Sequence, residues 1–231
     1  MTTSKKLFKK TLSVQMAESL EESIINGEWA VGEKMPSEPE LAEIYGVSRN
    51  TLREAIHYLA ISGLVDVRPG DGTYVRNRSA LDATMEKHLK KDDLYDILEV
   101  RLLIEPQICA LAAERHTEKE LSELATLHDA LLKSFQNQAS DYIGRDIAFH
   151  IQVSSMCHNR LLSDIYNSII SRYPQLFKDG FLSFMESDEL ELYLHNDLYR
   201  FIAEKNTDAA RELTIRMLEN EKSDFNDLKI K

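Results

Sequence analysis

The chain has few cysteines and no long apolar stretch. Only two cysteines, Cys109 and Cys157, occur among its 231 residues, and they do not form the C-x-x-C pairing of a metal or redox motif. This composition argues against a disulfide-stabilised scaffold and fits a reducing compartment. No apolar run approaches the length of a membrane span, and the charged N-terminus is followed by an amphipathic segment rather than a signal-peptide core. We therefore expect a cytoplasmic protein with no membrane partner.

Internal repeats, low-complexity segments and catalytic motifs are also lacking. Ser154 and Ser155 lie near His150 in the sequence, but no motif for nucleophilic catalysis accompanies them. A di-iron bundle needs repeated Glu-x-x-His pairs, whereas this chain has a single Asp-x-x-x-His. We therefore expect that the protein is not an enzyme. A metal-dependent enzyme with an accessory N-terminal domain is kept as an alternative.

The negative charge is distributed unevenly along the chain. Residues 1–78 carry 10 Lys and Arg against 11 Asp and Glu, and the remainder carries 18 against 28, which together give the net charge of −11. A phosphate backbone repels so acidic a second part, so we expect nucleic-acid contact only in the first. The length allows two domains. We predict a DNA-binding domain over 1–78, a partly helical linker over 79–92 and an all-helical domain over 93–231.

Two short helices joined by a tight turn are predicted near residues 37–61. Ser37 followed by Glu40 is a capping box, which starts the first helix at Glu38. Gly46 ends this helix, and Ser48 caps the second. Apolar residues recur at helical spacing in both segments, so each helix has one face to bury.

The N-terminal end of the second helix carries side chains suited to DNA. Arg49, Asn50 and Arg53 lie away from its apolar stripe, and Arg can pair bidentately with guanine as Asn can with adenine. Asn50 could equally form only local hydrogen bonds. Two β-branched runs then flank a Pro-Gly-Asp-Gly turn within 68–72, which predicts a hairpin. This order of elements is that of a winged helix-turn-helix.

The same segment resembles the N-terminal domain of the GntR family of bacterial transcription regulators. The matching stretches are Ile25-Asn-Gly27, Val31-Gly-Glu-Lys-Met-Pro-Ser-Glu38, Leu41-Ala42, Gly46-Val-Ser-Arg49, Leu52-Arg-Glu-Ala55, Leu59, Gly63-Leu64 and Gly70-Asp-Gly72. The resemblance implies the following DNA contacts: Ser48, Arg49, Asn50, Thr51, Arg53 and, at the tip of the wing, Gly70. Pro39 stands where many members have an Arg, so we expect one phosphate or base contact to be missing.

The rest of the chain is predicted to be helical. The amphipathic segments span about 93–115, 117–137, 140–157, 161–178, 187–205 and 207–224. Pro106 lies within the first and Pro174 within the fourth, where a proline kinks a helix or leaves a carbonyl unpaired. The predicted fold is therefore mainly α, with an N-terminal winged helix-turn-helix, a small β-hairpin wing and an all-α helical bundle.

One group of side chains in this bundle could hold an ion. Asp146 and His150 are four residues apart and so share a helix face, and His195 comes from another helix. Two imidazoles and a carboxylate can bind a divalent metal with positions left open for water or an anion. A metal-free pocket that binds an effector through the same residues is a second interpretation. A third is that both histidines are core residues satisfied by Asp146 or by the backbone.

The bundle resembles the FCD domain, the all-helical effector-binding module of the FadR subgroup of GntR regulators. The matching stretches are Val100-Arg-Leu-Leu-Ile-Glu-Pro106, Asp146-Ile-Ala-Phe-His150, Asn159, His195 and Asp208-Ala-Ala-Arg211. The resemblance implies a zinc, manganese or nickel ion held by Asp146, His150 and His195. Met217 replaces the third His of metal-binding members, and a thioether is a poor ligand for these metals.

The resemblance also places Arg101 in the effector cavity, beside His150 and His195. A cation there would bind a small carboxylate effector. An ion pair with Glu105, four residues along the helix, is the structural alternative.

The expected function is that of a ligand-responsive regulator, binding a palindromic DNA operator as a homodimer. A constitutive repressor with a vestigial, metal-free pocket is the alternative that Met217 suggests.

Overall fold

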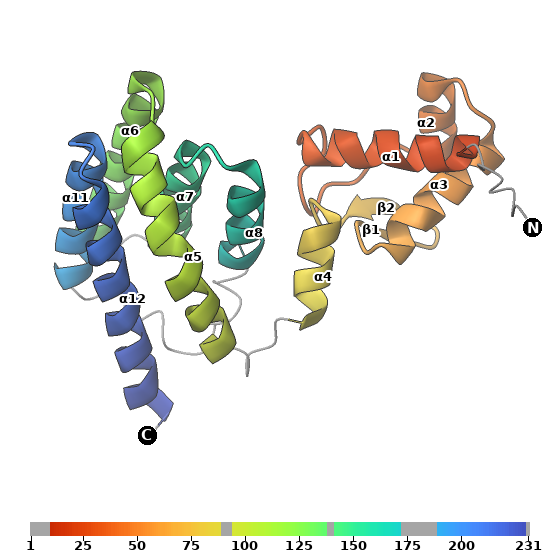
Figure 1. Cartoon of the computed structure of the whole chain (residues 1–231). Coiled ribbons are helices and arrows are strands. Elements are labelled where there is room, and N and C mark those ends of the chain that lie inside the picture. Colours follow the sequence, from red (N-terminus) through yellow and green to blue (C-terminus); the bar gives the residue numbers. More distant parts are fainter. Residues whose placement is uncertain (1–9, 89–93, 138–140, 172–188, 230–231) are drawn as a thin grey trace, which may run out of the picture. The chain divides into compact units, whose positions relative to one another are not determined.

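The computed structural model describes residues 10–88, 94–137, 141–171 and 189–229 (Figure 1). By their internal contacts the residues form two compact units, Met1–His88 and Leu89–Lys231. No helix among the described residues is long and apolar enough to cross a bilayer.

The first unit contains four helices and a two-stranded antiparallel sheet among its described residues. Its elements are α1 (Leu12–Ile25), α2 (Glu38–Tyr45), α3 (Arg49–Ile61), β1 (Val65–Arg68), β2 (Gly72–Val75) and α4 (Ala80–His88). The predicted capping box is present, since Oε2 of Glu40 accepts from the Ser37 amide at 2.8 Å. Gly46 adopts the left-handed conformation that ends α2. Oγ of Ser48 accepts from the Thr51 amide at 3.1 Å and so caps α3.

The hairpin that follows α3 is the predicted wing. Val65 pairs with Val75 at its base and Arg68 with Gly72 near its tip. Gly70 has a φ of +77°, which a side chain would strain. The segment before α2 adds a short bridge between Lys34 and Tyr74. The wing is therefore fixed to the loop between α1 and α2.

The second unit is an all-helical bundle over the described residues. Its helices are α5 (Leu94–Arg115), α6 (Glu118–Gln136), α7 (Tyr142–Met156), α8 (Arg160–Ile170), α11 (Glu189–Ala203) and α12 (Thr207–Lys229). Pro106 lies within α5 without ending it. Pro174 and residues 172–178 of the predicted fourth helix lie outside the described residues.

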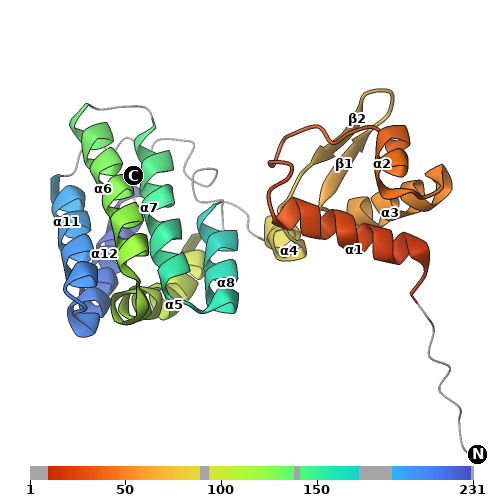
Figure 2. The same cartoon turned by 90° about the horizontal axis from the view of Figure 1, so that it is seen from above.

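Helix α5 packs against α7, α8, α11 and α12, and Figure 2 shows it between α12 and α8. Fully buried side chains such as Leu98, Leu124 and Phe149 fill the space between the helices. Burying each such side chain contributes about 1.5–3 kcal/mol. Because α12 packs along α5, residues of these two helices that are far apart in sequence lie close together.

Candidate functional site

The N-terminal end of α3 exposes three of the predicted DNA contacts. Arg49, Asn50 and Arg53 are all exposed. Nε of Arg53 lies 3.2 Å from Oε2 of Glu38, the first residue of α2. Nδ2 of Asn50 donates to Glu54 at 3.3 Å, so the local hydrogen bond expected as an alternative is present. An exposed ion pair of this kind contributes little to stability, so Arg53 can exchange Glu38 for phosphate at small cost.

The two hydroxyl side chains at this helix end have local partners. Oγ of Ser48 lies 2.9 Å from Oγ1 of Thr51 in addition to capping α3. Both hydroxyls therefore stabilise the start of the helix. They remain beside its N-terminus, where amides can bind an anion.

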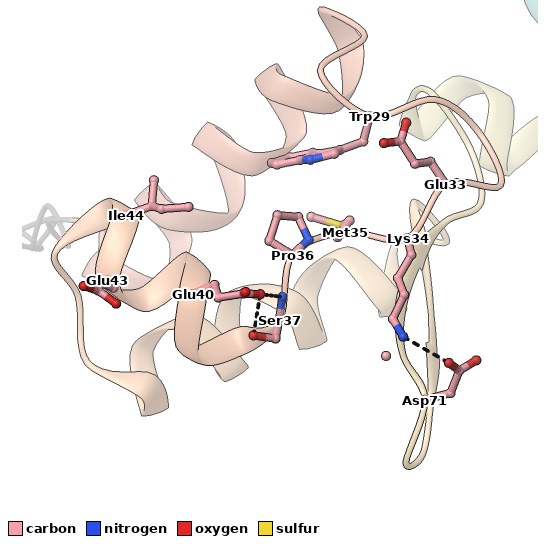
Figure 3. A pocket seen from close by; sticks show the side chains of 11 residues that line it. Trp29, Glu33, Lys34, Met35, Pro36, Ser37, Glu40, Glu43, Ile44 and Asp71 are labelled. Carbon is pink, nitrogen blue, oxygen red and sulfur yellow. Dashed lines mark hydrogen bonds and ion pairs between the residues drawn. The ribbon is translucent and has the colours of Figure 1, made fainter.

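A pocket in the same unit was not predicted from the sequence. It lies between the α1–α2 loop, α2 and the wing, and Figure 3 shows Trp29, Met35 and Pro36 between Ile44 of α2 and Lys34 beside the wing. At the edge of the pocket, Nζ of Lys34 lies 3.1 Å from Oδ1 of Asp71. A Cβ on Gly72 would lie 2.5 Å from Cε of Lys34, so the absence of a side chain at Gly72 leaves room for the Lys34 side chain to lie across the wing.

In the second unit, α7 and α11 bring Asp146, His150 and His195 together. Oδ1 of Asp146 lies 2.8 Å from Nε2 of His195 and 3.6 Å from Nε2 of His150. The two Nε2 atoms are 3.2 Å apart. Both imidazoles are buried, and Phe149 packs edge-on against each of them.

These three donor atoms have the spacing of ligands around one small cation. With metal–ligand bonds of about 2.1 Å, ligand atoms lie about 3.0 Å apart at right angles and about 3.4 Å apart in a tetrahedron. Oδ1 of Asp146 is buried, and within the described part of the chain it has no aligned hydrogen-bond donor despite the short distance to His195. The three atoms thus converge on a common point, and their chemistry fits a divalent transition metal.

A buried ion network lies behind His150. Nδ1 of His150 is 3.5 Å from Oε1 of Glu105, and Nε of Arg101 donates to Oε2 of the same carboxylate at 2.9 Å. Nη1 of Arg101 also donates to both oxygens of Glu221, on α12, at 2.9 and 3.0 Å. The ion pair of Arg101 with Glu105 matches the structural alternative expected from their spacing. Glu221 was missed because no local pattern indicates a partner 120 residues away.

The electrostatic environment sets the ionisation of two of the candidate ligands, Asp146 and His150. Burial alone would raise the pKa of Asp146, but His150 and His195 hold it at about 2. Burial lowers the pKa of His150, against the opposing influence of Asp146 and Glu105. At neutral pH, Asp146 is therefore ionised and His150 neutral, which are the states that bind a metal ion.

The remaining residues around this group are less polar. Met217 is buried in the bundle core on α12, and the cation-binding group comprises three ligands among the described residues. The hydroxyl of Tyr166 on α8 is buried and has no hydrogen-bond partner within the described residues. Sequence reasoning did not single out this tyrosine, because its helix shows an ordinary apolar pattern.

Comparison with known proteins gives two family matches. Residues 12–75 match the model of bacterial regulatory proteins of the gntR family, and residues 96–220 match the FCD domain. The HTH-type transcriptional regulator LutR of Bacillus subtilis is 31% identical over 85% of this chain and 93% of its own length. The galactonate operon transcriptional repressor of Escherichia coli is 27% identical over 87% of this chain and 90% of its own. A solved Streptococcus agalactiae GntR protein aligns with a TM-score of 0.61 and 29% identity, covering 90% of this chain and 97% of that one.

Proposed function

The chain belongs to the gntR family of bacterial regulatory proteins and is a DNA-binding transcription regulator with an FCD domain, and we propose that a small organic acid controls its affinity for DNA. The acid would bind in the helical bundle at a divalent cation held by Asp146, His150 and His195. The convergence of their three donor atoms is the observation that carries this proposal.

The charge balance of the bundle supports a divalent ion. Among the described residues, this network holds the carboxylates of Asp146, Glu105 and Glu221 and one guanidinium, that of Arg101. Burial raises the pKa of Glu221 to about 7, so with neutral imidazoles the network carries between one and two net negative charges at neutral pH, which a divalent cation would offset. Buried charge of one sign is costly unless it is compensated.

The cation would provide open coordination positions for a carboxylate effector. Arg101 would favour an anion by its charge, although Glu105 and Glu221 already accept its hydrogen bonds. The named relatives include a galactonate operon repressor, and galactonate is a small acid of this chemical class.

In the DNA-binding unit, we assign base and phosphate contacts to Arg49, Asn50 and Arg53. Ser48 and Thr51 would bind phosphate at the helix N-terminus, and Gly70 would let the tip of the wing approach the duplex. Two copies of the chain would bind the half-sites of a palindrome in the cytoplasm. To switch DNA affinity, the effector must bind the DNA-competent and DNA-incompetent arrangements unequally.

The cation site is tested by the metal content of protein purified without chelator or nickel affinity resin. We expect near-stoichiometric zinc, manganese or nickel in the unmodified protein and none in the Asp146→Ala, His150→Ala double variant. The His158→Ala variant, which removes an exposed histidine of the same unit, should keep the metal. Metal-free protein in every case would refute the cation site and leave a metal-free pocket.

The regulatory role is tested with DNA selected from a random-sequence library by the purified protein. Organic acids that raise the unfolding temperature are then added, and the affinity for the selected DNA is measured. A change in affinity supports ligand control. An unchanged affinity with every stabilising acid would favour the alternative, a constitutive repressor with a vestigial pocket.

A further inference from the structure

Glu105 lies between the candidate ligand His150 and the guanidinium of Arg101. It is 2% exposed, and its two oxygens face different partners. Oε2 accepts from Nε of Arg101 at 2.9 Å, whereas Oε1 lies 3.5 Å from Nδ1 of His150. One carboxylate thus links a fixed cation to the outer nitrogen of a candidate ligand.

The contact between the two imidazoles couples the tautomer of His150 to that of His195, because one Nε2 atom must donate and the other must accept. Nε2 of His195 lies 2.8 Å from Oδ1 of Asp146 and 3.2 Å from Nε2 of His150. When the metal-free protein carries the His195 proton on Nε2, that atom can donate to Nε2 of His150. In that arrangement Nε2 of His150 accepts, so His150 carries its proton on Nδ1, toward Glu105.

The geometry points to Glu105 as the residue that positions His150, by holding its proton on Nδ1 and so turning the unprotonated Nε2 toward the cation. This inference rests on the cation site proposed above. A carboxylate behind a metal-binding imidazole fixes the ring orientation and raises its basicity.

Arg101 determines how a glutamine side chain would be oriented in place of Glu105. In a Glu105→Gln variant, the amide oxygen faces Nε of Arg101, because a guanidinium donates hydrogen bonds but cannot accept them. The amide nitrogen then faces His150 and donates to Nδ1. The variant is nearly isosteric, but it moves the proton of His150 to Nε2, the atom that should bind the cation.

The test compares Glu105→Gln with Glu221→Gln. The second variant also removes a buried carboxylate from Arg101 but leaves Glu105 in place. The tautomer of His150 is measured by nitrogen NMR in the metal-free proteins, with its signals assigned by their loss in His150→Asn. Zinc affinity is measured by competition with a chelator.

We expect Glu105→Gln to place the proton on Nε2 and to weaken zinc binding about 10- to 100-fold. Glu221→Gln should keep the Nδ1 proton and, because it removes a carboxylate from the same network, should weaken zinc binding by less than about tenfold, a difference below about 1.4 kcal/mol. A Glu105→Gln protein that retains the Nδ1 proton, or an unmodified protein that carries its proton on Nε2, would overturn the inference.

Two further outcomes separate this role from the cation site itself. If the unmodified protein binds no zinc but its tautomer changes in Glu105→Gln, the cation site fails and the positioning of His150 stands. If Glu105→Gln loses its helical circular dichroism, Glu105→Asp replaces it. The Glu105→Asp variant keeps the carboxylate and should keep the proton of His150 on Nδ1. Loss of the Nδ1 proton in Glu105→Asp would overturn the inference.

Discussion

At the scale of single residues, the partners of each arginine decide what it can bind. Arg101 is buried and held by two carboxylates, so an effector must compete with Glu105 and Glu221 for its hydrogen bonds. Arg53 is exposed and pairs with the partly exposed Glu38, which it can leave at little cost. The same residue type therefore serves a fixed internal network in one unit and an exchangeable surface contact in the other.

Arg49 provides a direct test of base recognition. We expect Arg49→Ala to weaken binding to the selected DNA by about 1–3 kcal/mol and to relax the preference at one base pair. Fluorescence anisotropy with single-base variants of that DNA measures both effects. Arg200→Ala, which removes an exposed arginine paired with Asp197 on α11, should leave DNA affinity unchanged. Equal losses in the two variants would contradict a base contact by Arg49.

Glu221 should make the stability of the metal-free protein depend on pH. Burial, only partly opposed by Arg101, raises its pKa from 4.5 to about 7. The folded state therefore holds this proton more tightly than the unfolded state. As the pH rises from about 4.5 to 7, the free energy of unfolding should fall by about 3 kcal/mol from this group.

This pH dependence is measured by urea unfolding in the presence of a chelator. Glu221→Gln should lack this pH-dependent contribution. As the pH rises from about 4.5 to 7, the free energy of unfolding of the unmodified protein should therefore fall relative to that of the variant. Glu219→Gln, an exposed neighbour on α12, should show the slope of the unmodified protein. Parallel pH profiles for all three proteins would show that Glu221 does not titrate as expected.

Residues with a local signal could be predicted from the sequence, and residues paired across the bundle could not. The Ser37 and Ser48 caps follow from spacing within one turn. Asp146 and His150 could be placed together because they share a helix. Glu221 and Tyr166 reach the same region only through the packing of α12 and α8 against α5, which the sequence does not encode locally.

At the scale of elements, the apolar periodicity of the helices determined most of what could be predicted. The starts of α2 and α3 follow from their serine caps and the end of α2 from Gly46, and the hairpin turns at the predicted Pro-Gly-Asp-Gly segment. The order in which helices pack could not be derived, because an apolar stripe does not specify its neighbour. The pocket beside Trp29 was missed for the same reason.

Pro39 on α2 explains a specific expectation for DNA affinity. It is exposed near the start of the helix, where the GntR resemblance leads us to expect a basic residue. Pro39→Arg should strengthen DNA binding and steepen the dependence of log affinity on log salt by about 0.9 per added phosphate contact. A salt series of anisotropy titrations measures the slope. Pro39→Ala is the control for the loss of the proline ring. If Pro39→Ala and Pro39→Arg show the same dependence of log affinity on log salt, a new phosphate contact by the arginine is excluded.

Met217 on α12 tests whether the site can accept another ligand. Met217→His should strengthen zinc binding by about tenfold or more, which corresponds to at least about 1.4 kcal/mol. Met217→Leu keeps an apolar side chain of similar size and should leave zinc affinity unchanged. Chelator competition compares the three proteins. An unchanged affinity in Met217→His would place this side chain out of reach of the cation.

At the scale of the whole molecule, the chain divides its charge and its chemistry between two units. The DNA-binding unit is nearly neutral overall and exposes its arginines on α3, whereas the bundle is strongly acidic and buries the arginine near its candidate site. A ligand that controlled DNA binding from the bundle, as we propose, would therefore act through a change in conformation rather than through direct contact with DNA.

Zinc should stabilise the bundle selectively. At a free concentration about 100 times its dissociation constant, it adds about 2.7 kcal/mol to the stability of the unit that binds it. For a unit of this size, the unfolding temperature should rise by roughly 5–10 °C. Differential scanning calorimetry measures the shift, and the Asp146→Ala, His150→Ala variant should not show it. A shift in that variant would indicate zinc binding elsewhere.

The intrinsic fluorescence of Trp29 reports on the DNA-binding unit. The chain has a single tryptophan, and it lines the pocket beside the wing. Its fluorescence is therefore a label-free signal from the first unit, to which the bundle contributes no tryptophan emission. A change in this emission when zinc or an organic acid binds to the bundle would record, in the unmodified protein, communication between the two units.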